Sequence, residues 1–200
     1  MALYGDIEVR GDNPFLLFDE WYGDAAGGIS GDPSAMVLST SGRDGGVSSR
    51  VVLLKEHCPG GFIFYTNYDS HKAAQLADNL NTALLFYWPH RGRQVRIEGI
   101  AEKVSAEKSE EYFISRPYGS RLGAWASRQS SVIKSPAEIT DRINTLKSRF
   151  GSEVPRPPHW GGYRVVPCLF EFWQEGVNRL HSRLRWRKVG EEWHAEMVAP

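Results

Sequence analysis

The chain has 200 residues, 41% of them hydrophobic and 12% aromatic, so one globular domain with a sizeable core is expected and a disordered chain is excluded. Its 24 basic and 24 acidic residues cancel, which argues against a nucleic-acid binder and requires any anion site to be a local cluster. Two cysteines without C-x-x-C spacing indicate a reducing compartment and disfavour a zinc site or a disulfide framework.

The N-terminal residues are not typical of a targeting segment. Residues 1–10 contain Asp6 and Glu8 and no apolar stretch, so no signal peptide is expected. The longest apolar run, Ala83 to Trp88, is too short to span a bilayer. We therefore expect a cytoplasmic protein, with residues 1–12 as a flexible segment and residues 13–200 as a single domain.

The first half of that domain is predicted to be a helix followed by paired strands. Asn13 and Pro14 indicate a helix start, and Ser70 is a candidate cap for a helix over His71 to Leu80. Strands are expected at Ala35–Thr40, Val47–Lys55, Phe62–Thr66, Thr82–Trp88 and Arg93–Val104. The first two form a hairpin, and the fourth is apolar on both faces and hence expected to be buried.

The second half begins with helices and ends with strands. A helix over Ser105 to Arg116 is stopped by Pro117, and the capping box Ser135-Pro136-Ala137-Glu138 opens a helix to about Phe150. The closing strands are Tyr163–Val166 continuing into Leu169–Gln174, Arg179–Lys188 and Glu192–Val198. Seven or eight strands joined by tight turns predict a mainly β fold with helices, namely a largely antiparallel barrel with flanking helices.

One segment near the C-terminus concentrates cationic side chains. If Arg179 to Lys188 is a strand, its period places Arg179, His181 and Arg183 on one face over roughly 13 Å. That row could hold two anions, or one anion and a reacting ring. Three apolar side chains are expected to point into the core instead: Leu180, Leu184 and Trp186. The alternative is a solvated basic edge strand, because Arg185 and Arg187 continue the row.

Two helix ends are further candidate anion sites. His71 and Lys72 lie in the first turn of their helix, where a bound phosphate would offset the unfavourable dipole and accept from free N–H groups. Tyr112 and Arg116 share a face of the next helix, and Ser120 follows in the expected turn, so three donors could clamp a phosphate. The alternatives are a lysine that points to water and an arginine that simply favours the helix C-terminus.

A fourth candidate lies on the second strand of the hairpin. Arg50 and Lys55 are five residues apart, so a regular strand would place them on opposite faces. If both contact one ligand, the strand must twist, bulge or end between them. The alternative is a buried strand with charged ends.

Taken together and in this order, the motifs of the chain resemble the pyridoxine/pyridoxamine 5'-phosphate oxidase family from about Pro14 to Pro200. They are Arg50-Val-Val-Leu-Leu-Lys55, Phe64-Tyr-Thr-Asn67, Arg93-Gln-Val95, Tyr112-Phe-Ile-Ser-Arg-Pro117, Gly123-Ala-Trp125, Arg128-Gln-Ser-Ser131, Trp160-Gly-Gly162, the segment from Glu171 to Arg183 and the terminal Ala199-Pro200. Any one of them is a weak signal, and the ordered set is specific.

The resemblance implies a split β-barrel, a homodimer with FMN at the subunit interface, and oxidation of pyridoxine or pyridoxamine 5'-phosphate by oxygen to pyridoxal 5'-phosphate and hydrogen peroxide. By matching motif, FMN contacts fall on Arg50, Val51, Lys55, Tyr65, Thr66, His71, Lys72, Gln94, Gln129, Ser130, Trp173 and Arg183. Substrate contacts fall on Lys55, Tyr112, Arg116, Ser120, Arg179 and His181. Arg179 and His181 are the expected catalytic residues, and no metal is implied.

Two departures from the family pattern and three alternatives accompany this resemblance. Ser182 stands where the family usually has an acidic residue, and by alternation it faces away from the ligands. The lid residues of some relatives have no clear match, although Tyr4 and Arg10 are candidates. The alternatives are a phenazine-pathway flavin oxidase on the same scaffold, a non-catalytic FMN or pyridoxal phosphate carrier, and a nucleic-acid-binding barrel, which the zero net charge disfavours.

Overall fold

The computed structural model describes residue 7 and residues 11–27 and 31–200, so Tyr4, Arg10 and most of the expected N-terminal segment lie outside the described residues. The strands are β1 (Ala35–Ser41), β2 (Val47–Leu53), β3 (Glu56–Cys58), β4 (Gly61–Asn67), β5 (Asn81–Trp88), β6 (Arg93–Lys103), β7 (Trp160–Gln174), β8 (Ser182–Val189) and β9 (Glu192–Met197). The helices are α1 (Pro14–Ala26), α2 (His71–Asp78), α3 (Ala106–Ser115), α4 (Tyr118–Ala126) and α5 (Pro136–Phe150), with short 3₁₀ turns η1 (Pro89–Arg91) and η2 (Val177–Arg179).

The described residues form nine strands, where seven or eight were predicted, because the short β3 was not foreseen. They belong to one curled antiparallel sheet, as the short connections predicted. Its order is β2-β1-β5-β6-β7-β4-β3, and β8 continues from β7 to β9. The pairing of β6 with β7 has a register shift between Glu98 and Gly99. A Cβ on Gly99 would lie 2.2 Å from the Val166 carbonyl oxygen, so only glycine permits this close approach.

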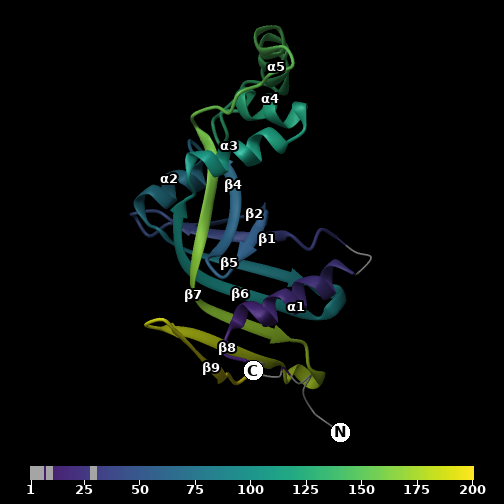
Figure 1. Ribbon diagram of the computed structural model, residues 1–200, viewed down its shortest axis with the longest axis vertical. Helices are drawn as coiled ribbons and strands as arrows, with labels where there is room; N and C mark the ends of the chain where they lie inside the picture. Colours follow the sequence, from purple (N-terminus) through teal and green to yellow (C-terminus); the bar gives the residue numbers. More distant parts are fainter. Residues whose placement is uncertain (1–6, 8–10, 28–30) are drawn as a thin grey trace.

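The long strand β7 connects the two ends of the molecule. Its first residues pair with β4, and its last residues pair with β8. Figure 1 shows helices α3, α4 and α5 gathered at one end of β7 and the strands β8 and β9 at the other. Groups carried by opposite ends of β7 are therefore far apart within one chain.

Helix α1 fills the inside of the curled sheet. Asn13 caps it as predicted, because its side chain accepts a hydrogen bond from Phe15 N at 3.0 Å. Phe18 is fully buried, with ring centroids 4.9 Å from Phe62 and 5.1 Å from Phe86. Burial of such a ring contributes about 2–3 kcal/mol, so this contact joins the helix firmly to β4 and β5.

The helical end differs from the sequence prediction in two places. Ser120 lies in a second helix, α4, and not in a turn, because Pro117 ends α3 and then serves as the N-cap residue of α4. Ser135 makes no side-chain cap bond at α5; Glu138 accepts instead from Lys134 N at 3.2 Å. None of the described helices is long and apolar enough to cross a membrane.

Two strand predictions are wrong in part. Arg179 lies in η2 with a left-handed φ of 64°, and β8 begins only at Ser182, so Arg179 and His181 do not extend a strand face toward Arg183. A tight turn replaces that part of the strand, and the Leu180 side chain is 36% exposed there. On β5 the burial alternates and Tyr87 is exposed, because none of the described elements covers that face at Tyr87.

The rest of the alternation on β8 agrees with the prediction. Leu184 and Trp186 are buried in the core. Ser182 is buried on that same side, away from Arg183. The position at which the family usually has an acidic residue, Ser182 in this chain, therefore lies on the inner face of β8.

Candidate functional site

A cleft of about 890 Å³ lies between β2, β4 and the helical end of the molecule. It collects twelve of the candidate residues: Arg50, Val51, Lys55, Tyr65, Thr66, His71, Lys72, Tyr112, Arg116, Ser120, Gln129 and Ser130. Four of these have basic side chains, namely Arg50, Lys55, Lys72 and Arg116, and no aspartate or glutamate is found among its lining residues within the described chain. We call this the cationic cleft, and its charge makes it suited to anions.

Lys72 occupies a buried corner of the cationic cleft. Its amine donates to Gln129 Oε1 at 2.9 Å, Thr66 Oγ1 at 3.2 Å and Ser70 Oγ at 3.3 Å, none of which carries a charge. Burial, together with the nearby charge of Arg50, lowers the pKa of Lys72 to about 8. A cation held in this way without a counter-charge is arranged for a bound anion.

Arg50 is held by neutral groups. Its guanidinium donates to Thr40 Oγ1 at 2.7 Å, Ser48 Oγ at 2.6 Å and the Leu38 carbonyl at 3.1 Å. Burial lowers the pKa of Arg50, and no carboxylate offsets its charge. Strand β2 ends at Leu53, so the chain has left the regular strand before Lys55 and both cations reach the same cleft, as the spacing required.

The start of helix α2 forms the neighbouring wall. His71 N donates to Ser130 Oγ at 3.2 Å, which joins the helix N-terminus to the loop that carries Gln129. Ser130 has a φ of 72°, a left-handed conformation that is uncommon for a residue other than glycine. Such local strain often accompanies a binding site, because it fixes the direction of backbone and side-chain donors.

The opposite wall is a stack of aromatic rings. The Tyr65 ring lies 4.0 Å from that of Tyr112 and 5.4 Å from that of Trp160, nearly parallel to both. Gly162 permits this stack, since a Cβ there would lie 2.8 Å from Tyr65 Cε1. Burial, with Glu56 nearby, raises the pKa of Tyr65 to about 12, so its hydroxyl stays protonated.

Arg116 packs on the same stack. Its guanidinium carbon lies 4.6 Å from the centroid of Trp160, and its Nη1 is buried without a hydrogen-bond partner. Burial lowers the pKa of Arg116. A buried donor without a partner is costly, so this atom is free for an anionic group of a ligand. Trp160 was not a predicted site residue; only its place in the motif before Gly161 and Gly162 pointed to it.

The remaining five candidates form a second cluster, which we define as Gln94, Trp173, Arg179, His181 and Arg183. Gln94 lies opposite Trp173 across β6 and β7, and Arg183 lies opposite Trp173 across β7 and β8. The ring of His181 is 4.6 Å from that of Trp173. None of the five lines the cationic cleft.

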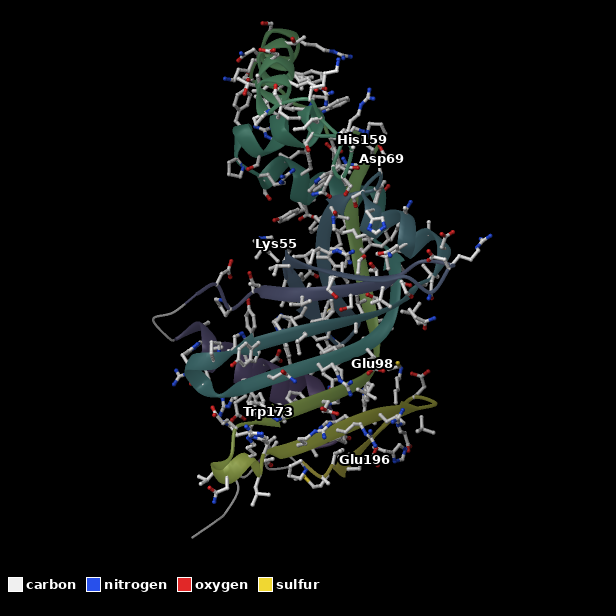
Figure 2. The ribbon with its side chains drawn as sticks, turned by 180° about the vertical axis from the view of Figure 1, so that it is seen from behind. Lys55, Asp69, Glu98, His159, Trp173 and Glu196 are labelled. Carbon is white, nitrogen blue, oxygen red and sulfur yellow. The ribbon has the colours of Figure 1, made fainter. Side chains whose placement is uncertain are left out.

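The second cluster cannot reach the cationic cleft of its own chain. Trp160 lines the cleft and Trp173 belongs to the cluster, and Trp173 lies thirteen positions further along β7, which corresponds to roughly 43 Å of extended chain. In Figure 2, Lys55 and Trp173 lie on opposite sides of the strands between them.

The turn before β8 determines which ring nitrogen of His181 accepts a hydrogen bond. Gly176 N donates to His181 Nδ1 at 3.2 Å, so that nitrogen is an acceptor and the neutral ring carries its proton on Nε2. A Cβ on Gly176 would lie 2.0 Å from the Leu180 carbonyl oxygen, so only glycine lets the turn close this tightly. Arg179, at its left-handed φ, is held in the same turn.

Comparison with known proteins decides the family. The sequence model of the family described as pyridoxamine 5'-phosphate oxidase matches residues 28–150. The pyridoxine/pyridoxamine 5'-phosphate oxidase of Bordetella petrii is 50% identical over 94% of this chain and 90% of its own length. The chain belongs to the pyridoxine/pyridoxamine 5'-phosphate oxidase family. The oxidase of the same name from Thermosynechococcus vestitus is 49% identical over the same shares of both chains.

Solved structures and a second family model add to this assignment. PhzG from Burkholderia lata, determined in complex with tetrahydrophenazine-1-carboxylic acid, superposes with a TM-score of 0.92 at 28% identity over 100% of both chains. An FMN-binding protein related to pyridoxamine 5'-phosphate oxidase, from Nostoc punctiforme, shares the fold with a TM-score of 0.74 at 14% identity, covering 92% of this chain and 96% of its own. Residues 160–200 match the C-terminal dimerisation region of pyridoxine 5'-phosphate oxidase, which here comprises β7, β8 and β9.

Proposed function

We propose that this protein oxidises pyridoxamine 5'-phosphate and pyridoxine 5'-phosphate with oxygen to pyridoxal 5'-phosphate, using bound FMN, with residues 13–200 acting as one domain. Hydrogen peroxide is released in both reactions, and the amine substrate also consumes water and yields ammonia. The observation that carries the proposal is the cationic cleft, which gathers Arg50, Lys55, Lys72 and Arg116 without an acidic residue in its described lining. FMN and the substrate each carry one phosphate, and the cleft has enough cationic side chains to bind two phosphates.

The residues present fit FMN. Lys72 is a buried cation with neutral partners only, and Arg50 beside it is held by hydroxyl and carbonyl groups, so together they supply uncompensated positive charge for one phosphate. The N-terminus of α2 adds favourable dipole and backbone N–H groups. When bound, FMN supplies the redox chemistry by accepting a hydride from the substrate.

The second phosphate position is assigned to the aromatic wall. Arg116 has a buried guanidinium nitrogen without a partner, and Tyr112 and Ser120 line the cleft beside it. Lys55 lines the same cleft and is proposed to contact both ligands. These residues bind and orient the substrate, because orientation against the cofactor is the main contribution that protein groups make to a hydride transfer.

A second subunit is proposed to complete the site. The second cluster lies too far from its own cationic cleft, and it belongs to the region that matches the family's dimerisation region. Val47 and Val51 are 72% and 64% exposed on β2, and Val51 also lines the cleft. Burial of such an apolar edge strand against a second copy would bring the partner's second cluster to this cleft.

Two residues of the second cluster are proposed to act on the substrate ring. Arg179 orients the ring, and the left-handed backbone at Arg179 sets the direction of its side chain. His181 donates from Nε2–H to the polar substituent that reacts, because Gly176 N already occupies Nδ1. As the hydride leaves the carbon, the alcohol substrate also loses its O–H proton, which passes to water, and the neutral amine substrate forms an iminium that water hydrolyses, so no strong base is required in this scheme.

Absorbance and peroxide release test this function. Purified protein is expected to show the visible bands of bound flavin, to bleach with pyridoxine 5'-phosphate under anaerobic conditions, and to release hydrogen peroxide in air. A protein without flavin, or a flavoprotein that carries FMN and yields no peroxide with either substrate, would contradict the proposal. The second outcome would indicate a non-catalytic carrier.

Mixed dimers test the shared site. Arg116→Met alters the cationic cleft and Arg179→Ala alters the second cluster, so each homodimer is expected to be defective. If each site combines the two subunits, a heterodimer of the two variants contains one intact site and recovers about half of the wild-type activity. Recovery of no activity would show that each subunit supplies its own site.

The similarity to PhzG supports a second candidate, a flavin oxidase of the phenazine-pathway type. The unpaired Arg116 nitrogen suits an anionic group, which is a phosphate in the first candidate and would be a carboxylate in the second. Turnover of pyridoxine 5'-phosphate, compared with turnover of unphosphorylated pyridoxine, separates the two: a preference for the phosphorylated compound that is lost in Arg116→Met supports the first candidate.

A further inference from the structure

A buried carboxylate on β7 bridges two arginines. Glu171 is 5% exposed, and its Oε1 accepts from Arg183 Nη2 at 2.9 Å while its Oε2 accepts from Arg96 Nη2 at 3.1 Å. It is neither in the cationic cleft nor in the second cluster as defined above. Burying a carboxylate costs free energy even when it is paired, so its presence here suggests a role beyond stability.

The choice of partner is specific. In the strand register, Glu171 lies directly opposite Arg185 on β8, and Arg183 is the diagonal neighbour. Arg185 nevertheless pairs with Glu196 on β9, with Nε 2.8 Å from Oε1. On β8, Glu171 therefore pairs with the diagonal Arg183 and not with the arginine directly opposite it.

Arg183 is held at both terminal nitrogens. Besides its bond to Glu171, its Nη1 donates to the Ala199 carbonyl at 2.9 Å. Two bonds of fixed direction leave a flexible side chain with one orientation, and they leave its remaining N–H groups for a ligand. The side chain is 27% exposed, so part of it is accessible to a ligand.

The charges of their partners distinguish Arg183 from Arg50 in the cationic cleft. Arg50 has neutral partners only, which leaves its full charge for a phosphate. Glu171 shares one negative charge between Arg96 and Arg183, which reduces the charge that Arg183 presents. Arg183 is thus suited to the polar, uncharged edge of a ring and not to a phosphate.

We propose that Glu171 is a positioning residue for the cofactor: it fixes the Arg183 guanidinium so that it contacts the uncharged ring edge of FMN. The inference rests on the proposed function, because Arg183 is assigned to FMN there. Glu171 itself is not proposed to touch the cofactor, and its effect passes entirely through Arg183.

The test measures FMN retention by the holoenzyme. Glu171→Gln keeps the size of the side chain and one acceptor oxygen and removes the charge. FMN release on dilution is monitored by flavin fluorescence, and we expect at least about fivefold weaker FMN binding than in the wild type. Glu196→Gln is the matched control, because it removes the carboxylate from the neighbouring pair with Arg185, and its FMN binding should stay within about twofold of wild type.

A double-mutant cycle separates positioning from general destabilisation. If Glu171 acts through Arg183, Glu171→Gln adds no further loss of FMN affinity to Arg183→Ala, whereas a structural effect adds to it. Additive losses, or unchanged binding by Glu171→Gln, would overturn the inference. Should Glu171→Gln not fold, Glu171→Asp keeps the buried charge and shortens the side chain by one methylene; weakened binding supports the role and unchanged binding overturns it.

The two proposals fail in distinguishable ways. A wild-type protein that carries no FMN refutes the proposed function and this inference together. A wild-type protein that carries FMN and oxidises pyridoxine 5'-phosphate, with Glu171→Gln equal to it in FMN binding, refutes only the role of Glu171.

Discussion

Replacing Lys72 by methionine is expected to stabilise the flavin-free protein and to weaken its binding of FMN. Lys72 is 8% exposed, and its amine has three neutral hydrogen-bond acceptors and no carboxylate partner. Methionine has a similar length and volume and carries no charge. The substitution therefore removes a buried charge that only a bound anion compensates.

The magnitude follows from the pKa of Lys72. A decrease from 10.5 to about 8 corresponds to a penalty of about 3 kcal/mol for the charged amine in the folded protein. The lost hydrogen bonds offset part of this gain, although Gln129 keeps its bond from Thr66 Oγ1 at 3.2 Å. A net stabilisation of about 1–2 kcal/mol remains, or roughly 2–8 °C in Tm for a chain of this size. The lost charge–phosphate interaction weakens FMN binding by about 10- to 100-fold.

The pH dependence has a definite sign. Below pH 8, Lys72 is charged in both the folded and the unfolded state, so the penalty is fully present. Between pH 8 and 10.5 the unfolded chain binds the additional proton, so wild-type stability rises with pH relative to the variant and the difference disappears near pH 10.5. A bound phosphate favours the charged amine, so the FMN affinity of the wild type falls as the pH rises above 8.

Calorimetry of the flavin-free protein at pH 7 and pH 10, with fluorescence titration by FMN, measures both effects. Lys147→Met, on the exposed face of α5, is the control; it should leave FMN binding unchanged and should not raise stability, because it removes a favourable charge from the last turn of the helix. A Lys72→Met protein that is less stable than wild type without flavin, or that binds FMN equally well, would refute the reasoning.

Three further predictions concern the substrate and the glycines of the site. Arg116→Met should raise KM for pyridoxine 5'-phosphate at least about tenfold with FMN still bound, because it removes the buried guanidinium assigned to the substrate phosphate; steady-state kinetics with the visible spectrum check both. Gly162→Ala should lower the free energy of unfolding by about 1–3 kcal/mol, since the new methyl would lie 2.7 Å from Val104 Cγ2 and 2.8 Å from the Tyr65 ring; an unchanged Tm would contradict this. Gly176→Ala should lower kcat/KM more than FMN affinity, because a Cβ 2.0 Å from the Leu180 oxygen opens the turn that holds His181; equal kinetics would show that this turn is not required.

Much of the local structure was determined by the sequence alone. Asn13 and Pro14 marked the start of α1, and alternation on β8 placed Leu184, Trp186 and Ser182 on the inner face. The short turns between strands predicted an antiparallel sheet. These features depend on residues close together in the chain, where propensity and periodicity act directly.

The sequence also predicted which cationic side chains come together. The candidate cations at Arg50, Lys72 and Arg116 do line one cleft, although the residues that carry them are far apart in the chain. The ordered motifs made that expectation possible, because each preserves a local arrangement of side chains. Their roles toward FMN and substrate remain the proposal tested above.

Only the tertiary structure decided which candidates can act together. Periodicity placed Arg179, His181 and Arg183 on one strand face, whereas the close approach of Gly176 to Leu180 makes a turn there. The length of β7 separates Trp173 from the cleft, so the candidates divide into two groups that a single chain cannot join. The bridge from Glu171 to Arg183 likewise depends on strand register. Contacts of this kind depend on the path of the chain through space, which local pattern does not specify.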